Sequence, residues 1–233
     1  MKTQAPCPPP DWTRISADLD AGGWATFRLL DPPACAHLAA RYDEPIFRSR
    51  VVMARHGFGR GEYQYFAAPL PEPVAALRAA LYPPLAEIAN RWAGRLGAAD
   101  RYPPTHAEFL ARCHAAGQTR PTPLLLRYGP GDYNCLHQDL YGPLAFPLQV
   151  AVLLSEPGRD FSGGEFVLVE NRPRMQSAAS VVPLVQGEAV AFAVNQRPVD
   201  GTRGDYRVTL RHGVSRIRAG QRMTLGIIFH DAE

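Results

Sequence analysis

Three features are missing from this chain of 233 residues, and each absence excludes a class of protein. No apolar run approaches the roughly 20 residues that cross a bilayer, so no membrane-spanning helix is predicted. The four cysteines stand far apart without a C-x-x-C pair. This spacing argues against a structural zinc module and suits reduced thiols in the cytoplasm. The opening residues lack an apolar core, so no secretory signal is expected.

Lysine is nearly absent, and arginine carries almost all of the positive charge. The net charge is +3 at pH 7, which by itself neither indicates nor excludes a nucleic-acid partner. The planar guanidinium group suits phosphate and carboxylate, so arginines are the candidates for binding anionic ligands. With 46% hydrophobic and 20% charged residues, the composition is that of an ordered globular chain.

The pattern along the chain predicts an α+β fold that is mainly β, namely a double-stranded β-helix (jelly roll) with helices packed on one face. Residues 122–233 contain eight short apolar runs separated by turn residues, which suits the two facing sheets of the core. Residues 12–121 carry helical spacing and a strand–turn–strand pattern at 47–66, and are expected to form a helical buttress and a substrate-loop region. Residues 1–11 are a proline-rich arm, so 12–233 is expected to be a single domain.

Several elements of the first half are predicted from local signals. Residues 22–30 read as a strand, and Asp31, followed by two prolines, as the N-cap of a helix. Residues 71–98 repeat apolar positions at three- and four-residue intervals, which predicts helix broken at Pro83–Pro84. Residues 106–117 predict a further helix that ends at a glycine.

His137 and Asp139 form an H-x-D pair in a predicted strand, where residues two apart point to the same face. His212 lies in another predicted strand. Two imidazoles and one carboxylate on one side of an ion leave its other positions open, which is the arrangement of non-haem iron(II) oxygenases. These three residues are therefore the predicted metal ligands and the predicted catalytic residues. The alternative is that either histidine is an ordinary core residue with satisfied hydrogen bonds.

Arg222 opens the last predicted strand and shares a face with Thr224. The turn at 218–221 is expected to fold this strand back beside the one that carries His212. An arginine inside a barrel needs an anion, because an unpaired buried charge is very costly. The distal carboxylate of a dicarboxylic acid fits, with the Thr224 hydroxyl adding a hydrogen bond. The alternative is a salt bridge between Arg222 and an internal carboxylate.

Tyr128 is a third candidate for binding that carboxylate, because it lies nine residues before His137 on the preceding predicted strand. It can equally be a tyrosine of the β core. Arg216 and Arg218 are rivals of Arg222 as the anion-binding residue. They precede the turn and are expected to face solvent.

The segment 47–66 alternates arginines with aromatic residues. Arginines pair with phosphates while an aromatic ring stacks on a base. A polar loop at 195–206 is a second candidate, as a lid over the mouth of the pocket. The alternative is that the charges form a solvated face and the tyrosines pack the barrel. The candidate substrate-binding residues are Arg55, Phe58, Arg60, Tyr63, Tyr65 and Arg203.

Taken together, the motifs HQD, FSGGEF (161–166) and GEAVAF (187–192), with a histidine ten residues before an arginine, resemble the iron(II)/2-oxoglutarate-dependent dioxygenase superfamily. The likeness covers about residues 122–233, and the opening GGWATFRLLDPPACAHL is also similar to the start of that superfamily. Within it, RYGPGDYNCLHQDLYG resembles a bacterial group predicted to act on nucleic acids, similar to the AlkB-type demethylases. The chain departs from the AlkB type at Leu126, which stands where that type has an asparagine. Its histidine-to-arginine interval is that of prolyl-hydroxylase-like enzymes.

The resemblance implies iron(II), 2-oxoglutarate as co-substrate and O₂. It implies oxidation of a C–H bond, by hydroxylation or oxidative demethylation, on a nucleic-acid base in DNA or RNA. A prolyl-type hydroxylase of protein or peptide, a hydroxylase of a small metabolite and a non-enzymatic, cupin-like metal-binding barrel remain open alternatives. A zinc hydrolase is disfavoured because no additional general base is evident.

Overall fold

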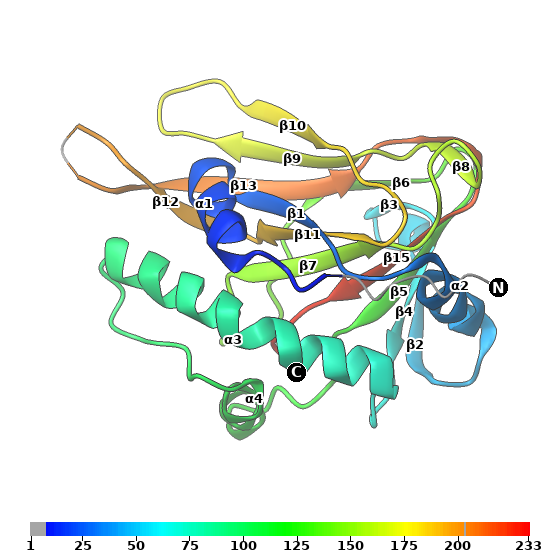
Figure 1. Ribbon diagram of the computed structural model, residues 1–233, viewed down its shortest axis with the longest axis horizontal. Coiled ribbons are helices and arrows are strands. Elements are labelled where there is room, and N and C mark those ends of the chain that lie inside the picture. The colour runs from blue at the N-terminus through cyan, green and yellow to red at the C-terminus, as the bar shows by residue number, and fades with distance from the viewer. Residues whose placement is uncertain (1–7, 203) are drawn as a thin grey trace.

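The structure is a computed structural model that describes residues 8–202 and 204–233 (Figure 1). Two antiparallel sheets face each other and form the predicted jelly roll. In spatial order the larger consists of β1 (Trp24–Arg28), β11 (Glu188–Ala193), β7 (Leu148–Leu153), β15 (Arg222–Ile227), β5 (Leu124–Tyr128), β4 (Glu62–Phe66) and β2 (Phe47–Val52). The smaller consists of β10 (Ala178–Val182), β9 (Phe166–Asn171), β13 (Tyr206–Val214), β6 (Tyr133–His137) and β3 (Gly59–Arg60), with β12 (Gln196–Val199) paired to β13. A short ribbon joins β8 (Phe161–Gly163) to β14 (Ile217–Gly220).

Helices cover the outer face of the larger sheet (Figure 1). They are α1 (Trp12–Gly22), α2 (Pro32–Ala40), α3 (Glu72–Arg95) and α4 (His106–Ala115), with 3-10 turns η1 (Arg41–Asp43) and η2 (Met53–Arg55). Every residue of β7 is buried because helices cover one of its faces and the smaller sheet the other. Side chains of α1, α3 and the larger sheet form one apolar core, for example Leu19, Leu85 and Val152.

Most of the elements predicted from the sequence are confirmed. All eight predicted strands of residues 122–233 are present, and β2 and β4 form the predicted strand pair of 47–66. Asp31 caps α2 by accepting a hydrogen bond from the Ala34 amide at 2.8 Å. The division of the domain into residues 12–121 and 122–233 stays a prediction, and strands from both parts share the larger sheet. Of the predicted arm, residues 1–7 lie outside the described residues.

One helix prediction is wrong, and one helix was not predicted. The break at Pro83–Pro84 is absent, because α3 runs continuously through both prolines. Proline removes backbone hydrogen bonds, but burial of Leu81, Tyr82 and Leu85 on this stretch of the helix opposes that loss. Helix α1 was not anticipated, although its cap is visible in the sequence. The Asp11 side chain accepts hydrogen bonds from the amides of Thr13 and Arg14, each at 3.1 Å.

The last strand does not lie beside the strand that carries His212, contrary to the sequence prediction. Strand β15 pairs with β5 and β7 in the larger sheet, whereas β13 belongs to the smaller one. The chain crosses between the sheets through β14 and the Gly220 turn. Arg222 and His212 therefore approach each other across the interior of the barrel, not along one sheet.

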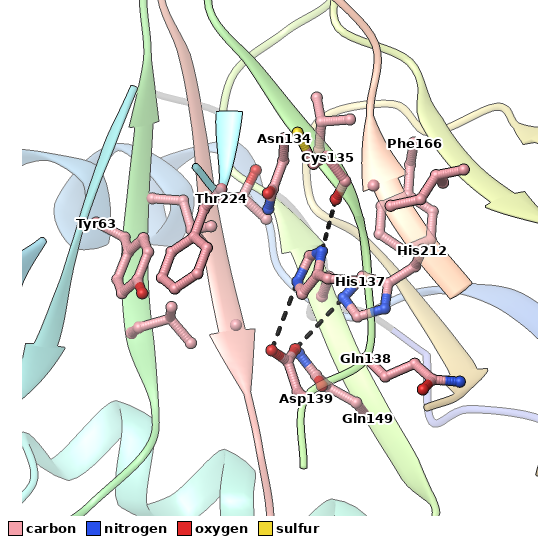
Figure 2. Close-up of a pocket in the computed structure, with 18 of the residues that line it drawn as sticks. Tyr63, Asn134, Cys135, His137, Gln138, Asp139, Gln149, Phe166, His212 and Thr224 are labelled. Carbon is pink, nitrogen blue, oxygen red and sulfur yellow. Dashed lines mark hydrogen bonds and ion pairs between the residues drawn. The ribbon is translucent and has the colours of Figure 1, made fainter. Parts of the chain in front are cut away.

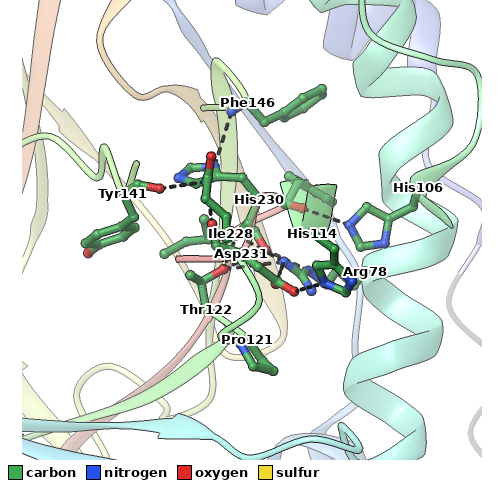
Figure 3. A network of polar contacts seen from close by, with 12 residues as sticks. Arg78, His106, His114, Pro121, Thr122, Tyr141, Phe146, Ile228, His230 and Asp231 are labelled. Carbon is green, nitrogen blue, oxygen red and sulfur yellow. Dashed lines mark hydrogen bonds and ion pairs between the residues drawn. The ribbon is translucent and has the colours of Figure 1, made fainter. Parts of the chain in front are cut away.

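The C-terminal segment is fixed to α3 by a buried network around Arg78 (Figure 3). The guanidinium forms an ion pair with Asp231 at 2.8 Å and donates to the carbonyls of Ile228 and His230 at 2.8 and 3.1 Å. Asp231 also accepts from His114 at 2.9 Å. The network therefore links the residues that follow β15 to both α3 and α4.

Arg78→Met is expected to lower the free energy of unfolding by about 3–5 kcal/mol, because it leaves the Asp231 carboxylate buried without its arginine. Urea denaturation of the purified protein measures the effect. The matched control is Arg91→Met on the same helix. The pair of Arg91 with Asp20 is partly exposed, so this change is expected to cost at most about 1 kcal/mol. Equal losses in the two variants would contradict the network's role.

Candidate metal and co-substrate site

A cavity of about 320 Å³ lies between the two sheets and is lined by residues of both. Its floor on the larger sheet is formed by Ala151 and Gly226, which face each other directly across β7 and β15. A Cβ on Gly226 would lie 2.6 Å from the Leu124 side chain. The cavity exists because these two facing positions carry almost no side chain.

His137 and Asp139 enter this cavity from the end of β6 (Figure 2). His137 is the last residue of the strand, so Asp139 lies just beyond it, not within it as predicted. The Nδ1 atom of His137 donates to the carbonyl oxygen of Cys135 at 2.8 Å. This bond fixes the ring so that Nε2 keeps its lone pair toward Asp139 and the cavity.

His212 stands directly opposite His137 in the β6–β13 pairing. Its ring lies 4.6 Å from that of Phe192 and 5.9 Å from that of Phe166, measured between centroids. Its Nδ1 atom is buried and has no hydrogen-bond partner among the described residues. The orientation of this imidazole is therefore set by aromatic packing, whereas that of His137 is set by a hydrogen bond.

The three side chains converge around the Asp139 carboxylate. Nε2 of His137 lies 3.5 Å from Oδ1, and Nε2 of His212 lies 3.3 Å from Oδ2. One ligand atom from each residue can be chosen so that all three lie within 4.8 Å of one another. The sequence prediction that these residues meet is thus confirmed, and together they could hold a metal ion.

The surroundings of Asp139 favour its ionised form, which is the form that binds a metal. Burial would raise the pKa of Asp139, but hydrogen bonds and charge from the two imidazoles hold it well below its usual range. Burial lowers the pKa of His212, and the charge of His137 acts in the same direction. For His137 the penalty of burial is outweighed by Asp139, so its pKa is raised. Metals bind neutral imidazole and ionised carboxylate, so the lowered pKa of Asp139 favours metal binding.

Arg222 lies in the same cavity and is only 2% exposed. No carboxylate in the part of the chain that the structure describes forms an ion pair with it, so the internal salt bridge considered from the sequence is not present. Glu165, whose charge acts on Arg222, instead bonds to Ser215 and lies 3.6 Å from Arg218. Burial lowers the pKa of Arg222 to about 10. A buried cation without an anion indicates a binding site for one.

The predicted partners surround this guanidinium. Its Nη1 donates to the Thr224 hydroxyl at 2.5 Å, and its Nε has no partner among the described residues. Tyr128 pairs with Arg222 across β5 and β15, and its ring centroid lies 5.8 Å from the Arg222 Cζ. The buried Tyr128 hydroxyl has no hydrogen bond of good geometry among the described residues. Burial raises its pKa, and the charge of Arg222 and the nearby Asn134 side chain act in the opposite direction. Two orphaned donors thus face the same cavity.

Gly164 of the FSGGEF motif makes room for the arginine. Its φ is +64°, and a Cβ there would lie 2.2 Å from Ile217 Cδ1 and 3.0 Å from Arg222 Cδ. Only glycine accepts both this backbone conformation and this close approach. The rivals Arg216 and Arg218 are exposed, as predicted.

The candidate substrate residues divide into three groups. Phe58, Tyr63 and Tyr65 line the cavity. Arg55 and Arg60 are exposed on the same loop but do not line it. Arg203 lies outside the described residues.

The lid predicted at 195–206 is wrong for the residues that the structure describes. None of them lines the cavity. The loop lies at the opposite end of β13, where Arg95 of α3 binds Asp200 at 2.5 Å and Asp205 at 2.6 Å. Asn195 alone approaches the site, by accepting from Gln138 at 2.8 Å.

Two residues that line the cavity, Tyr141 and Gln149, were not identified from the sequence. Tyr141 donates to Asp139 Oδ1 at 2.6 Å. Gln149 of β7 is 5% exposed, and its Oε1 has no partner among the described residues. Gln149 could have been noticed in the sequence because it is a polar residue in an apolar strand, on the same face as the small Ala151.

This donor set suits iron(II) and 2-oxoglutarate. Two nitrogens and one carboxylate without thiolate match the ligands of non-haem iron(II). The unpaired guanidinium and the orphaned tyrosine hydroxyl match a carboxylate at some distance from the metal. The metal-binding groups belong to the smaller sheet and its β6 extension, whereas the carboxylate-binding groups belong to the larger sheet.

Comparison with known proteins agrees with this assignment. Residues 61–232 match the model of the Oxygenase-NA family, described as "Oxygenase, catalysing oxidative methylation of damaged DNA". Two uncharacterized proteins of Mycobacterium tuberculosis, from strains CDC 1551 / Oshkosh and ATCC 25618 / H37Rv, are each 44% identical over 214 residues. These alignments cover 90% of this chain and 91% of the relatives.

Solved structures share the fold at low identity. A 2-oxoglutarate/iron(II) oxygenase-family oxidoreductase from Burkholderia pseudomallei is 15% identical with a TM-score of 0.57, over 98% of this chain and 96% of that one. A Pseudomonas putida prolyl-4-hydroxylase is 18% identical with a TM-score of 0.56, over 95% and 100%. The chain therefore belongs to the Oxygenase-NA family and is an oxygenase with the fold of the iron(II)- and 2-oxoglutarate-dependent enzymes.

Proposed function

We propose that the chain oxidises a C–H bond on a nucleic-acid base, with His137, Asp139 and His212 holding iron(II). Arg222, Thr224 and Tyr128 would bind the distal carboxylate of 2-oxoglutarate. The observation that carries this proposal is a buried arginine in the same cavity as the triad, for which the described part of the chain supplies no carboxylate partner. A metal site alone would not require that cation.

When bound, iron(II) and 2-oxoglutarate supply the oxidising chemistry, in which O₂ and the keto acid give succinate, CO₂ and one oxygen atom for the substrate. The protein positions and shields these reactants. Arg222 and Thr224 would orient the keto acid. Phe166 and Phe192 pack against the ring of His212. Ala151 and Gly226 leave space opposite the triad. The largely apolar walls keep water from the reacting groups.

Cavity size limits what reaches the metal. A volume of about 320 Å³ is near the lower end of the ~300–1,000 Å³ typical of ligand pockets, and it has to hold the keto acid as well. We therefore expect a ring or a single side chain to enter beside it. A base in a duplex would have to leave the stack to do so.

The mouth of the cavity carries groups suited to such a base. Phe58 is 48% exposed and stacks on His56 at 5.4 Å between ring centroids. Arg55 and Arg60 are exposed nearby, and Arg60 lies 3.8 Å from the Asp132 carboxylate. Aromatic stacking combined with exposed cations is a common way to bind single-stranded nucleic acid. The family description, which names damaged DNA, supports the same substrate class.

A prolyl-type hydroxylase of protein is the second candidate. A Trichoplax adhaerens prolyl hydroxylase, solved with a hypoxia inducible factor peptide fragment, shares the fold at 15% identity and a TM-score of 0.56, over 94% of this chain and 89% of that one. A single side chain also fits the cavity. A small-metabolite hydroxylase and a cupin-like metal-binding barrel without activity are the remaining alternatives.

Incubation with N-methylated single-stranded oligonucleotides, iron(II), ascorbate and 2-oxoglutarate is expected to release formaldehyde and succinate in equal amounts. Mass spectrometry of the oligonucleotide and of peptides treated in parallel separates the candidates. Phe58→Ala is expected to weaken oligonucleotide binding by about 1–3 kcal/mol, roughly 5- to 150-fold, through lost stacking. Added oxygen on peptides with unchanged oligonucleotides would favour the prolyl-type alternative. The absence of succinate from every mixture would favour the cupin-like metal-binding barrel without activity.

None of the described helices is long and apolar enough to cross a membrane. The cytoplasmic location and the single-domain organisation of residues 12–233 stay predictions from the sequence.

A further inference from the structure

Tyr141 is bound to the carboxylate of the triad through an arrangement that the function above does not use. Its hydroxyl donates to Asp139 Oδ1 at 2.6 Å. The same hydroxyl accepts from the Tyr65 hydroxyl at 3.2 Å, and the two rings meet edge to face with centroids 6.4 Å apart. The short Tyr141–Asp139 bond is of the charge-assisted kind, because the acceptor is ionised.

The backbone at Tyr141 is held as firmly as its side chain. Gln118 Nε2 donates to the Tyr141 carbonyl at 2.8 Å and to the Leu144 carbonyl at 2.9 Å. Gly142 has a φ of +94°, and a Cβ there would lie 2.7 Å from Gln118 Cδ. Gln118 is fully buried, and its two hydrogen bonds hold the loop that follows Asp139. Hydrogen bonds therefore hold both the backbone carbonyl and the hydroxyl of Tyr141.

The two oxygens of Asp139 consequently have different surroundings. Oδ1 accepts from the Tyr141 hydroxyl at 2.6 Å and lies 3.5 Å from His137 Nε2, whereas Oδ2 lies 3.3 Å from His212 Nε2 and has no hydroxyl donor among the described residues. A free carboxylate can bind a metal through one oxygen or through both. A fixed donor on one oxygen favours binding through the other.

We propose that Tyr141 is a positioning residue that makes Asp139 a one-oxygen ligand through Oδ2 and so keeps a coordination position open for the co-substrate. This inference rests on the proposed metal site. If iron(II) were bound by two histidines and one carboxylate oxygen, its remaining positions would be available to the keto acid and O₂. A second Asp139 oxygen on the metal would compete with one of them.

Tyr141→Phe removes the hydroxyl and keeps the ring. In the protein loaded with Co²⁺, the variant is expected to show an altered visible absorption spectrum before 2-oxoglutarate is added, because the carboxylate changes its mode of binding. The affinity for 2-oxoglutarate, measured by anaerobic calorimetry, is expected to fall about 10- to 100-fold. Both readouts are independent of catalysis and of the substrate.

Tyr82→Phe is the matched control, because it removes a buried tyrosine hydroxyl that lies outside the cavity and has no hydrogen-bond partner among the described residues. Its Co²⁺ spectrum and 2-oxoglutarate affinity are expected to match those of the unmodified protein. If Tyr141→Phe gives an unchanged spectrum and affinity while His137→Ala loses Co²⁺, the Tyr141 inference is overturned and the metal site stands. If His137→Ala binds Co²⁺ normally, the proposed metal site itself fails.

Discussion

Replacing His137 with alanine is expected to abolish the 2-oxoglutarate-dependent formation of succinate. The residue supplies one of three ligand atoms, and its ring is fixed by the hydrogen bond from Nδ1 to the Cys135 carbonyl. A metal held by one imidazole and one carboxylate binds more weakly and loses the facial geometry. A coupled assay for succinate measures turnover, and retention of iron(II) after gel filtration measures metal binding.

The control for this change is His37→Ala. His37 lies exposed on α2, outside the cavity, and is expected to leave both measurements unchanged. Alanine at position 137 with normal succinate formation would exclude the triad as the metal site. Loss of turnover with normal iron content would assign His137 to a step after metal binding.

Arg222→Met is expected to have two opposite effects. Without its guanidinium, the cavity loses the group that pairs with the distal carboxylate. Truncating one partner of a buried charged pair costs about 2–5 kcal/mol, so the dissociation constant of 2-oxoglutarate is expected to rise roughly 30-fold to several thousand-fold. The protein without co-substrate, however, is expected to be equally stable or about 1–4 kcal/mol more stable, because a buried cation without an anion is replaced by an apolar chain of similar length.

Calorimetry with 2-oxoglutarate and urea denaturation in its absence measure these two effects separately. Arg218→Met serves as the control, because this side chain is 75% exposed and is expected to change neither quantity. A variant at position 222 that binds 2-oxoglutarate normally would require another residue to bind the distal carboxylate. A variant that loses both affinity and stability would identify Arg222 as a structural residue of the barrel.

The triad and Arg222 could be predicted from sequence because each depends on short-range patterns. The H-x-D pair lies in a predicted strand, where residues two apart share a face, and the combined motifs resemble the iron(II)/2-oxoglutarate-dependent dioxygenase superfamily. The face shared by Arg222 and Thr224 followed from strand alternation alone. Both residues line the cavity, as this alternation requires.

The errors concern contacts between distant segments. Nothing local in the turn at 218–221 specifies that β15 crosses to the opposite sheet, because that choice depends on pairing with β5 and β7. The proline pair within α3 is tolerated because of tertiary burial, which propensity does not contain. Tyr141 was overlooked because its role depends on the rigid loop held by Gln118 and not on its own sequence context.

The substrate loop was predicted only in part. Alternation of arginine and aromatic residues in 47–66 could not separate the side chains that face the cavity from those that face solvent. Glycines at 57, 59 and 61 have positive φ and break the strand alternation there. Arg50 binds Glu62, and Arg48 lies over the Tyr65 ring at 4.5 Å, so both of these arginines have partners within the protein.

The placement of the metal-binding groups and the carboxylate-binding arginine on opposite sheets has a consequence for stability. A keto acid bound at both ends would bridge the two sheets. Because such a ligand would bind the folded protein and not the unfolded chain, we expect the two sheets to separate at a higher urea concentration in its presence than in its absence.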